Sequence, residues 1–140
     1  MNQQELKKHI MTILDAHQVG TLATINDGKP YTRYMTFFNK AFTLYTPTSK
    51  STHKVDHIEQ NPNVHILLGY EGDGYNDSFV EIEAVAEIEE DQETKKSLWN
   101  EKLGHYLSGP DDPNYVVIRC KPNSIRYMNA GKETPLELDF

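Results

Sequence analysis

The sequence predicts a mainly β domain of the α+β class, in which short, mostly antiparallel strands form a closed or half-closed barrel with about three helices. Short runs of β-branched and aromatic residues recur at close spacing between turn signals. One run, residues 79–89, alternates apolar and acidic residues, as a sheet with one solvated face requires. Helical and strand patterns do not alternate as in βαβ folds, which argues against a doubly wound sheet and leaves a ferredoxin-like sandwich as the alternative.

Three helices are predicted from apolar residues at helical spacing. The first covers residues 3–17, and the third runs from Asp91, which can cap it, to about residue 103. The second covers residues 53–60. Its start can be capped by Ser51 or Thr52, and Asn-Pro follows it.

Six to seven strands are expected between and after these helices. They cover residues 21–25, 31–39, 42–45, 64–68, 79–89, 116–120 and 125–128. Turn signals at 26–30 and 39–40 predict that the first three form an antiparallel meander of hairpins. Loops are expected at 46–52, 69–78 and 104–114, and an irregular tail from residue 129. Because no repeat or low-complexity linker interrupts the chain, we expect a single domain, residues 1–140.

Composition narrows the class of protein. No stretch approaches the ~20 apolar residues of a membrane span, and the first eight residues lack an apolar signal-peptide core. We therefore expect a cytoplasmic protein that has no membrane partner. Cys120 is the single cysteine and lies in an apolar run, which excludes an internal disulfide and predicts a buried structural thiol.

Charge is distributed unevenly along the chain. The net charge of −7 argues against a nucleic-acid partner, because such proteins present a basic face. Residues 29–57 nevertheless contain five lysines and arginines and one acidic residue, a net charge of +4, whereas the remainder carries −11. A basic segment in an acidic protein indicates a small, local anion site.

The same segment contains the parts of a phosphate cradle. Arg33 lies on a predicted strand, and Lys54 lies in the first turn of the second predicted helix. A helix N-terminus offers free N–H groups and a partial positive charge, while arginine can clamp a phosphate with two parallel hydrogen bonds. Further hydroxyl donors are available from Thr46, Ser49, Ser51 and Thr52. The alternative is that Arg33 is a surface residue paired with a glutamate.

These motifs resemble the flavin-binding core of the pyridoxamine-phosphate-oxidase-like superfamily. The similarity lies in Arg-Tyr-Met-Thr at 33–36, Leu-Tyr-Thr at 44–46, Ser-Thr-His-Lys at 51–54 and Ile-Glu-Gln-Asn-Pro-Asn-Val at 58–64. The chain is most similar to the short bacterial general stress protein 26 group, which the loop at 109–113 also resembles. The resemblance implies an FMN-binding split β-barrel.

The resemblance also implies roles for individual residues. Arg33 and Lys54 would hold the flavin phosphate, Thr46 would donate its hydroxyl to it, and Tyr45 would lie along the ribityl chain with the backbone of 35–38. The full set of implied cofactor-binding residues is Arg33, Tyr34, Met35, Thr36, Phe38, Tyr45, Thr46, Ser51, Thr52, His53 and Lys54. FMN is expected because the cradle provides for one terminal phosphate, and FAD is the alternative. The family implies a homodimer with flavin sites at its interface.

Three departures from the family pattern bear on activity. His53 stands where full oxidases carry an arginine, and histidine is a weaker, pH-dependent phosphate ligand. Phe79 lies near the position of a polar flavin contact. The chain also lacks a recognisable C-terminal segment for the pyridoxal-phosphate substrate, so we do not expect oxidation of pyridoxamine phosphate.

The leading hypothesis is a stress-related flavin oxidoreductase that takes a hydride from a nicotinamide donor to a small acceptor, with no obligatory catalytic side chain. The alternatives are a non-enzymatic flavin-binding or redox-sensing protein and a cofactor-free barrel that serves as an interaction module. A haem-binding barrel is disfavoured, because no histidine of this sequence lies in a clear axial-ligand context. His53 and His57 are four apart on a helix, but no third metal ligand follows at motif spacing, so no metal site is predicted.

Overall fold

The computed structural model describes residues 1–129, 131 and 135–140. Three α-helices and eight strands lie within these residues. The helices are α1 (Gln3–Ala16), α2 (His53–Gln60) and α3 (Gln92–Leu98). The strands are β1 (Val19–Asn26), β2 (Lys29–Thr36), β3 (Phe38–Lys40), β4 (Thr43–Ser49), β5 (Asn63–Leu68), β6 (Phe79–Glu89), β7 (Tyr115–Met128) and β8 (Leu136–Glu137).

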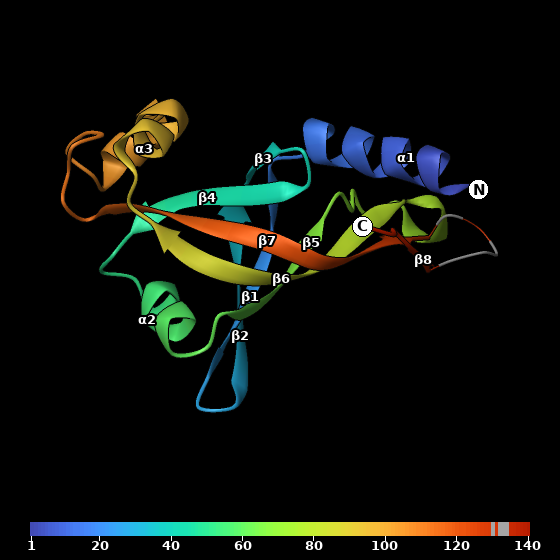
Figure 1. Ribbon diagram of the computed structural model, residues 1–140, viewed down its shortest axis with the longest axis horizontal. Helices are drawn as coiled ribbons and strands as arrows, with labels where there is room; N and C mark the ends of the chain where they lie inside the picture. Colours follow the sequence, from blue (N-terminus) through green and yellow to red (C-terminus); the bar gives the residue numbers. More distant parts are fainter. Residues whose placement is uncertain (130, 132–134) are drawn as a thin grey trace.

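The strands form one curled antiparallel sheet (Figure 1). Its order is β2-β1-β5-β6-β7-β4-β3, so β2 and β3 lie at opposite ends of the path although only Phe37 separates them in sequence. The sheet must therefore curl to bring its two ends together. Phe37 sits at this junction with 2% of its surface exposed, and its N–H donates to the carbonyl of Gln18. This incomplete closure confirms the split-barrel fold.

The early strands differ from the expected meander. The strand expected at 31–39 divides at Phe37, because β2 pairs with β1 whereas β3 pairs with β4. β4 in turn pairs with β7 rather than with β2. It also runs on to Ser49, so residues 46–49 are strand and not the expected loop. Pro47 is tolerated there because β3 pairs only with Thr43 to Tyr45, which leaves β4 unpaired on that side.

The later strands and helix also begin or end at other residues than the sequence predicted. The two strands expected at 116–120 and 125–128 are one strand, β7, whose register against β6 shifts by one residue beside Pro122. A β-bulge of this kind keeps the strand continuous. The third helix ends at Leu98, and a short 3₁₀ helix, η2 (Glu101–His105), follows it. The tail, expected to be irregular, contains β8, which pairs with β7; residues 130 and 132–134 lie outside the described part.

The core fills the barrel and is covered at one end by α1 (Figure 1). Leu6, Ile10, Ile13 and Leu14 of α1 are buried, as their helical spacing predicted. Along β6, Val80, Ile82, Ala84 and Ala86 are buried, whereas none of the four glutamates is buried and Glu83 and Glu87 are exposed, which confirms the predicted alternation. Cys120 is buried as expected, and burial raises the pKa of its thiol to about 12. A second cluster around Tyr115 lies beneath α3 and η2.

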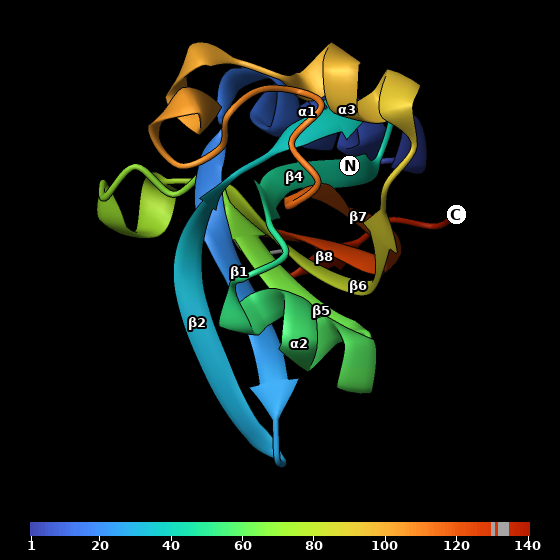
Figure 2. The same ribbon diagram turned by 90° about the vertical axis from the view of Figure 1, so that its left-hand side faces the viewer.

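The hairpin of β1 and β2 extends from the body of the molecule beside α2 (Figures 1 and 2). Asp27 and Gly28 form its tip, both with positive φ (53° and 74°), the conformation of a type I′ turn. β2 is an edge strand with much of its surface uncovered: Tyr34 is 79% exposed and Tyr31 43%. None of the described helices is both long and apolar enough to cross a bilayer.

Candidate flavin site

A small cavity of about 590 Å³ lies between the β1–β2 hairpin and α2. Its lining contains two cationic side chains and two histidines. The lining residues are Asn26, Tyr31, Arg33, Thr52, His53, Lys54 and His57. The fold thus brings together the arginine of β2 and the first turn of α2, which are about twenty positions apart in the chain.

Arg33 is half-buried, and its guanidinium is hydrogen-bonded to two residues of β1. Its Nη1 donates to the Thr24 hydroxyl (2.7 Å) and to the Leu22 carbonyl (3.1 Å). Within residues 1–129, 131 and 135–140, no carboxylate forms an ion pair with it, so the surface Arg–Glu interpretation is wrong. Burial lowers the pKa of Arg33, a sign that its charge is partly desolvated.

Lys54 is the second cation of the small cavity. Burial lowers the pKa of Lys54, and the nearby charge of Arg33 lowers it further. Among the described residues Lys54, too, has no carboxylate within ion-pair distance. Two partly desolvated like charges without a counter-ion are unfavourable in the free protein. A bound anion would compensate both of them.

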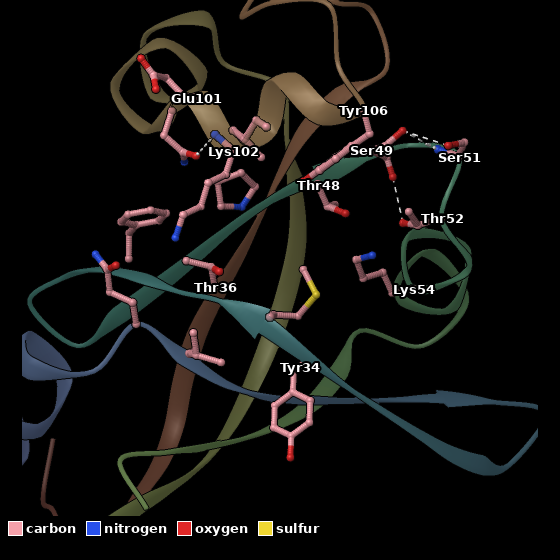
Figure 3. A pocket seen from close by; sticks show the side chains of 17 residues that line it. Tyr34, Thr36, Thr48, Ser49, Ser51, Thr52, Lys54, Glu101, Lys102 and Tyr106 are labelled. Atoms are coloured by element: carbon pink, nitrogen blue, oxygen red, sulfur yellow. Dashed lines mark hydrogen bonds between the residues drawn. The ribbon is translucent and has the colours of Figure 1, made fainter. Parts of the chain in front are cut away.

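A larger cavity of about 1040 Å³ adjoins the first and shares Thr52 and Lys54 with it. Figure 3 shows that it is framed by β2, β4, the start of α2 and η2, with Lys54 extending into the space between β2 and β4. The lining residues are Gln18, Val19, Tyr34, Met35, Thr36, Phe38, Pro47, Thr48, Ser49, Ser51, Thr52, Lys54, Asn100, Glu101, Lys102, Leu103 and Tyr106. Together the cavities suit an elongated ligand with one anionic end.

Hydroxyl groups order the segment between β4 and α2. The Thr52 hydroxyl donates to the Ser49 carbonyl (2.8 Å), and the Ser49 and Ser51 hydroxyls are 2.9 Å apart (Figure 3). Thr52 occupies the N-cap position, but its side chain does not accept from the helix as expected, because it is turned back to Ser49. The first-turn amides of α2 therefore have no side-chain cap.

Nine of the eleven residues implied by the resemblance line one or both cavities. Tyr45 does not: its ring packs against the cluster around Tyr115, under Lys40. Thr46 does not either, since it is fully buried and its hydroxyl has no hydrogen-bond partner among the described residues. A ligand outside the barrel cannot reach an enclosed hydroxyl, so we leave Thr46 out of the proposed contacts. Phe79 packs edge-on against Tyr70 and lines neither cavity.

Several lining residues were not recognised in the sequence. Ser49 is one of the hydroxyl donors predicted from the sequence, but Pro47 and Thr48 are not, although a run of small polar residues next to the Tyr-Thr pair was a usable signal. Residues 100–103 and 106 reach the cavity only because β6 and β7 place η2 over it, and no local pattern reveals this. Of the five basic residues in segment 29–57, Arg33 and Lys54 line these two cavities and the other three do not; Lys50, for example, pairs with Glu90.

Comparison with known proteins agrees with this architecture. The sequence matches the family described as Pyridoxamine 5'-phosphate oxidase over residues 6–129. It is 51% identical over 140 residues, the full length of both chains, to General stress protein 26 of Bacillus subtilis (strain 168). The structure is similar to that of the General Stress Protein 26 from Bacillus anthracis str. Sterne, with 39% identity, a TM-score of 0.87 and 97% and 99% of the two chains covered.

Two further solved structures share the fold. One is a putative pyridoxamine 5'-phosphate oxidase from Listeria innocua, 38% identical, with a TM-score of 0.80 and coverage of 89% and 99% of the two chains. The other, an FAD-binding protein from Mesorhizobium loti, is 21% identical with a TM-score of 0.67 and coverage of 84% and 90%, a likeness of fold alone. The chain therefore belongs to the pyridoxamine 5'-phosphate oxidase-like family, within its general stress protein 26 group.

Proposed function

We propose that the protein binds FMN, with the phosphate in the small cavity and the ring system in the larger one. The observation that carries the proposal is the pair of partly buried cations, Arg33 and Lys54, which have no carboxylate partner among the described residues. A dianionic phosphate placed between them would neutralise both and could accept charge-assisted hydrogen bonds from each.

The residues present fit this cofactor in shape as well as in charge. The phosphate end requires cations and donors, which Arg33, Lys54 and the uncapped first turn of α2 supply. The ring end requires an apolar wall with scattered polar groups, which Met35, Phe38 and the hydroxyl-rich end of β4 supply. One cationic end favours FMN over FAD, although a structure of the same fold is described as that of an FAD-binding protein.

We further propose that the protein is an oxidoreductase that uses electrons from a nicotinamide donor for a small acceptor. Flavin supplies this chemistry when bound, and the protein binds, orients and shields it. Arg33 and Lys54 would fix one end of the cofactor, and β2 would present backbone groups along its edge. Tyr106 lines the larger cavity, and burial raises the pKa of its hydroxyl above the ordinary value of about 10, so it is a neutral hydrogen-bonding group there.

We propose that the active form is a homodimer. β2 is an uncovered edge strand that contributes Tyr34, Met35 and Thr36 to the wall of the larger cavity, yet Tyr34 is 79% exposed. A second copy packed on the β1–β2 hairpin would cover this strand and close the cavity over a ring system. Light scattering at micromolar concentration should give twice the mass of the chain, and a monomer would contradict the proposal.

The cofactor is tested by the visible spectrum of the purified protein, before and after excess FMN and gel filtration. We expect a retained flavin spectrum, and tighter binding of FMN than of riboflavin, which lacks the phosphate. A colourless protein that retains no added FMN would overturn the proposal and favour the cofactor-free interaction module. Anaerobic bleaching by NADH or NADPH at a useful rate supports the oxidoreductase, whereas a flavin that is not reduced favours a flavin store or sensor.

A further inference from the structure

Behind the small cavity, a buried chain of hydrogen bonds connects β2, β1 and α2. Arg33 Nη1 of β2 donates to the Thr24 hydroxyl of β1 at 2.7 Å, and this hydroxyl lies 2.8 Å from Nδ1 of His57 on α2. Thr24 is fully buried and His57 is 7% exposed. None of the sequence motifs pointed to Thr24, and His57 appeared there only as half of an incomplete metal pair.

The donor and acceptor groups of the three side chains determine which atom donates in each of these hydrogen bonds. A guanidinium only donates, so the Thr24 oxygen accepts from Arg33. Its own proton needs an acceptor, because a buried polar group left unpaired is costly. The acceptor in place is Nδ1 of His57, which requires a neutral imidazole that carries its proton on Nε2.

The surroundings of His57 favour the neutral form. Burial lowers the pKa of His57, and the charges of Arg33 on β2 and His53 on α2 lower it further, against the opposing effect of Asp56. Tyr31 of β2 packs against the imidazole, with the ring centres 5.1 Å apart, and Lys54 shares the cavity lining. β6 also packs on α2, and its residues beside the start of β5, Ala84 and Ala86, are buried and uncharged.

We propose that Thr24 and His57 are positioning residues, which hold the Arg33 guanidinium at the small cavity so that it can bind the anionic end of a ligand. The inference deepens the proposed function and rests on it for the identity of that ligand as a phosphate. The Thr24 hydroxyl fixes one Nη atom of Arg33, and the His57 imidazole fixes the hydroxyl. No hydrogen bond from the Nη2 and Nε groups of Arg33 is present in the part of the chain that the structure describes, so these groups are left for the ligand.

The first test measures the affinities of FMN and riboflavin by quenching of flavin fluorescence. Thr24→Val keeps the side-chain shape and removes the hydroxyl, and we expect it to weaken FMN binding about tenfold while riboflavin binding stays unchanged. Thr24→Ser, which keeps the hydroxyl, should restore wild-type affinity. In an Arg33→Gln background, Thr24→Val should have no further effect on FMN affinity, because its effect passes through Arg33. Unchanged FMN binding in Thr24→Val, or additive losses, would overturn the inference.

Two substitutions of His57 test the same inference if the Thr24→Val variant does not fold. His57→Leu removes the acceptor and should weaken FMN binding in the same direction, whereas His57→Asn, whose carbonyl oxygen can take the place of Nδ1, should preserve most of the affinity. Equal FMN affinities in these two variants would contradict the inference.

The second test needs no flavin, so it separates this inference from the proposed function. Nitrogen NMR of the histidines should show His57 near pH 7 as the neutral tautomer protonated on Nε2, and its pKa should rise in Arg33→Gln because a neighbouring positive charge is removed. If wild-type protein binds neither FMN nor riboflavin, the proposed function fails while this result still decides the inference. An Nδ1-protonated His57, or a pKa insensitive to Arg33, would refute it.

Discussion

Replacing Lys54 with methionine should lower the affinity for FMN while leaving the stability of the ligand-free protein unchanged or raised. Lys54 is half-buried beside Arg33 and has no carboxylate partner among the described residues. Its charge is therefore a cost in the free protein and becomes favourable when a phosphate is bound. Methionine keeps much of the apolar stem that lines both cavities.

The expected loss follows from the position of the side chain. A hydrogen bond to a charged group contributes about 1.5–3 kcal/mol. Because Lys54 remains partly open to solvent, which weakens the interaction, we expect a loss around the lower end of this range, about 1–2 kcal/mol or roughly 5- to 30-fold in Kd. The free protein should melt at the same or a higher temperature, because the repulsion between Lys54 and Arg33 is relieved.

Fluorescence titration with FMN and riboflavin, together with thermal melts without ligand, measures both effects. The matched control is Lys50→Met: Lys50 is close in sequence but pairs with Glu90 and lines neither cavity, so FMN affinity should not change. Lys54→Met with wild-type affinity for FMN, or an equal loss for riboflavin, would refute the reasoning.

Three further predictions concern the scaffold. A Cβ atom on Gly20 would lie 2.4 Å from the Leu67 carbonyl oxygen, so Gly20→Ala should reduce the free energy of unfolding by about 1–3 kcal/mol in urea titrations, whereas Gly109→Ala, with open space around it, should not. The hydrogen bond that the His17 imidazole donates to the Glu71 carboxylate raises the pKa of His17, so the difference in stability between wild type and His17→Gln should be full below pH 6.5 and vanish as pH rises through the raised pKa. Equal differences at pH 5.5 and 8.5 would contradict this. Cys120, whose thiol pKa burial raises to about 12, should react with a disulfide reagent only after unfolding, and fast reaction of the native protein would show that the strand opens.

The sequence was informative wherever a local pattern decides the structure. The apolar spacing of α1 and the alternation along β6 predicted which residues are buried, because each face has a fixed period. The split at Phe37 was not predictable in this way, since the aromatic run reads as one strand and only closure of the barrel assigns its halves to different partners. The Pro-Asn-Ser segment of β7 looked like a turn because a bulge and a turn share these residues.

In the candidate site, too, some residues could be predicted from a local sequence pattern and others only from the tertiary structure. Arg33 and Lys54 could be predicted because a cation on a strand and a cation in the first turn of a helix are both suited to binding a phosphate, and both residues line the small cavity. Tyr45 was assigned by resemblance alone and Thr46 also as a hydroxyl donor, and their burial depends on β7 and η2, which begin about 70 and about 55 positions later. Thr24 lies in an ordinary strand pattern, and its connection to His57 exists only after α2 packs on β1.

A crystal structure of the protein with FMN tests the central claim most directly. The account predicts the phosphate in the small cavity, in hydrogen-bond contact with Arg33 and Lys54, and the ring system in the larger cavity between β2 and η2. Flavin bound with its phosphate elsewhere, leaving Arg33 and Lys54 without an anion, would contradict it.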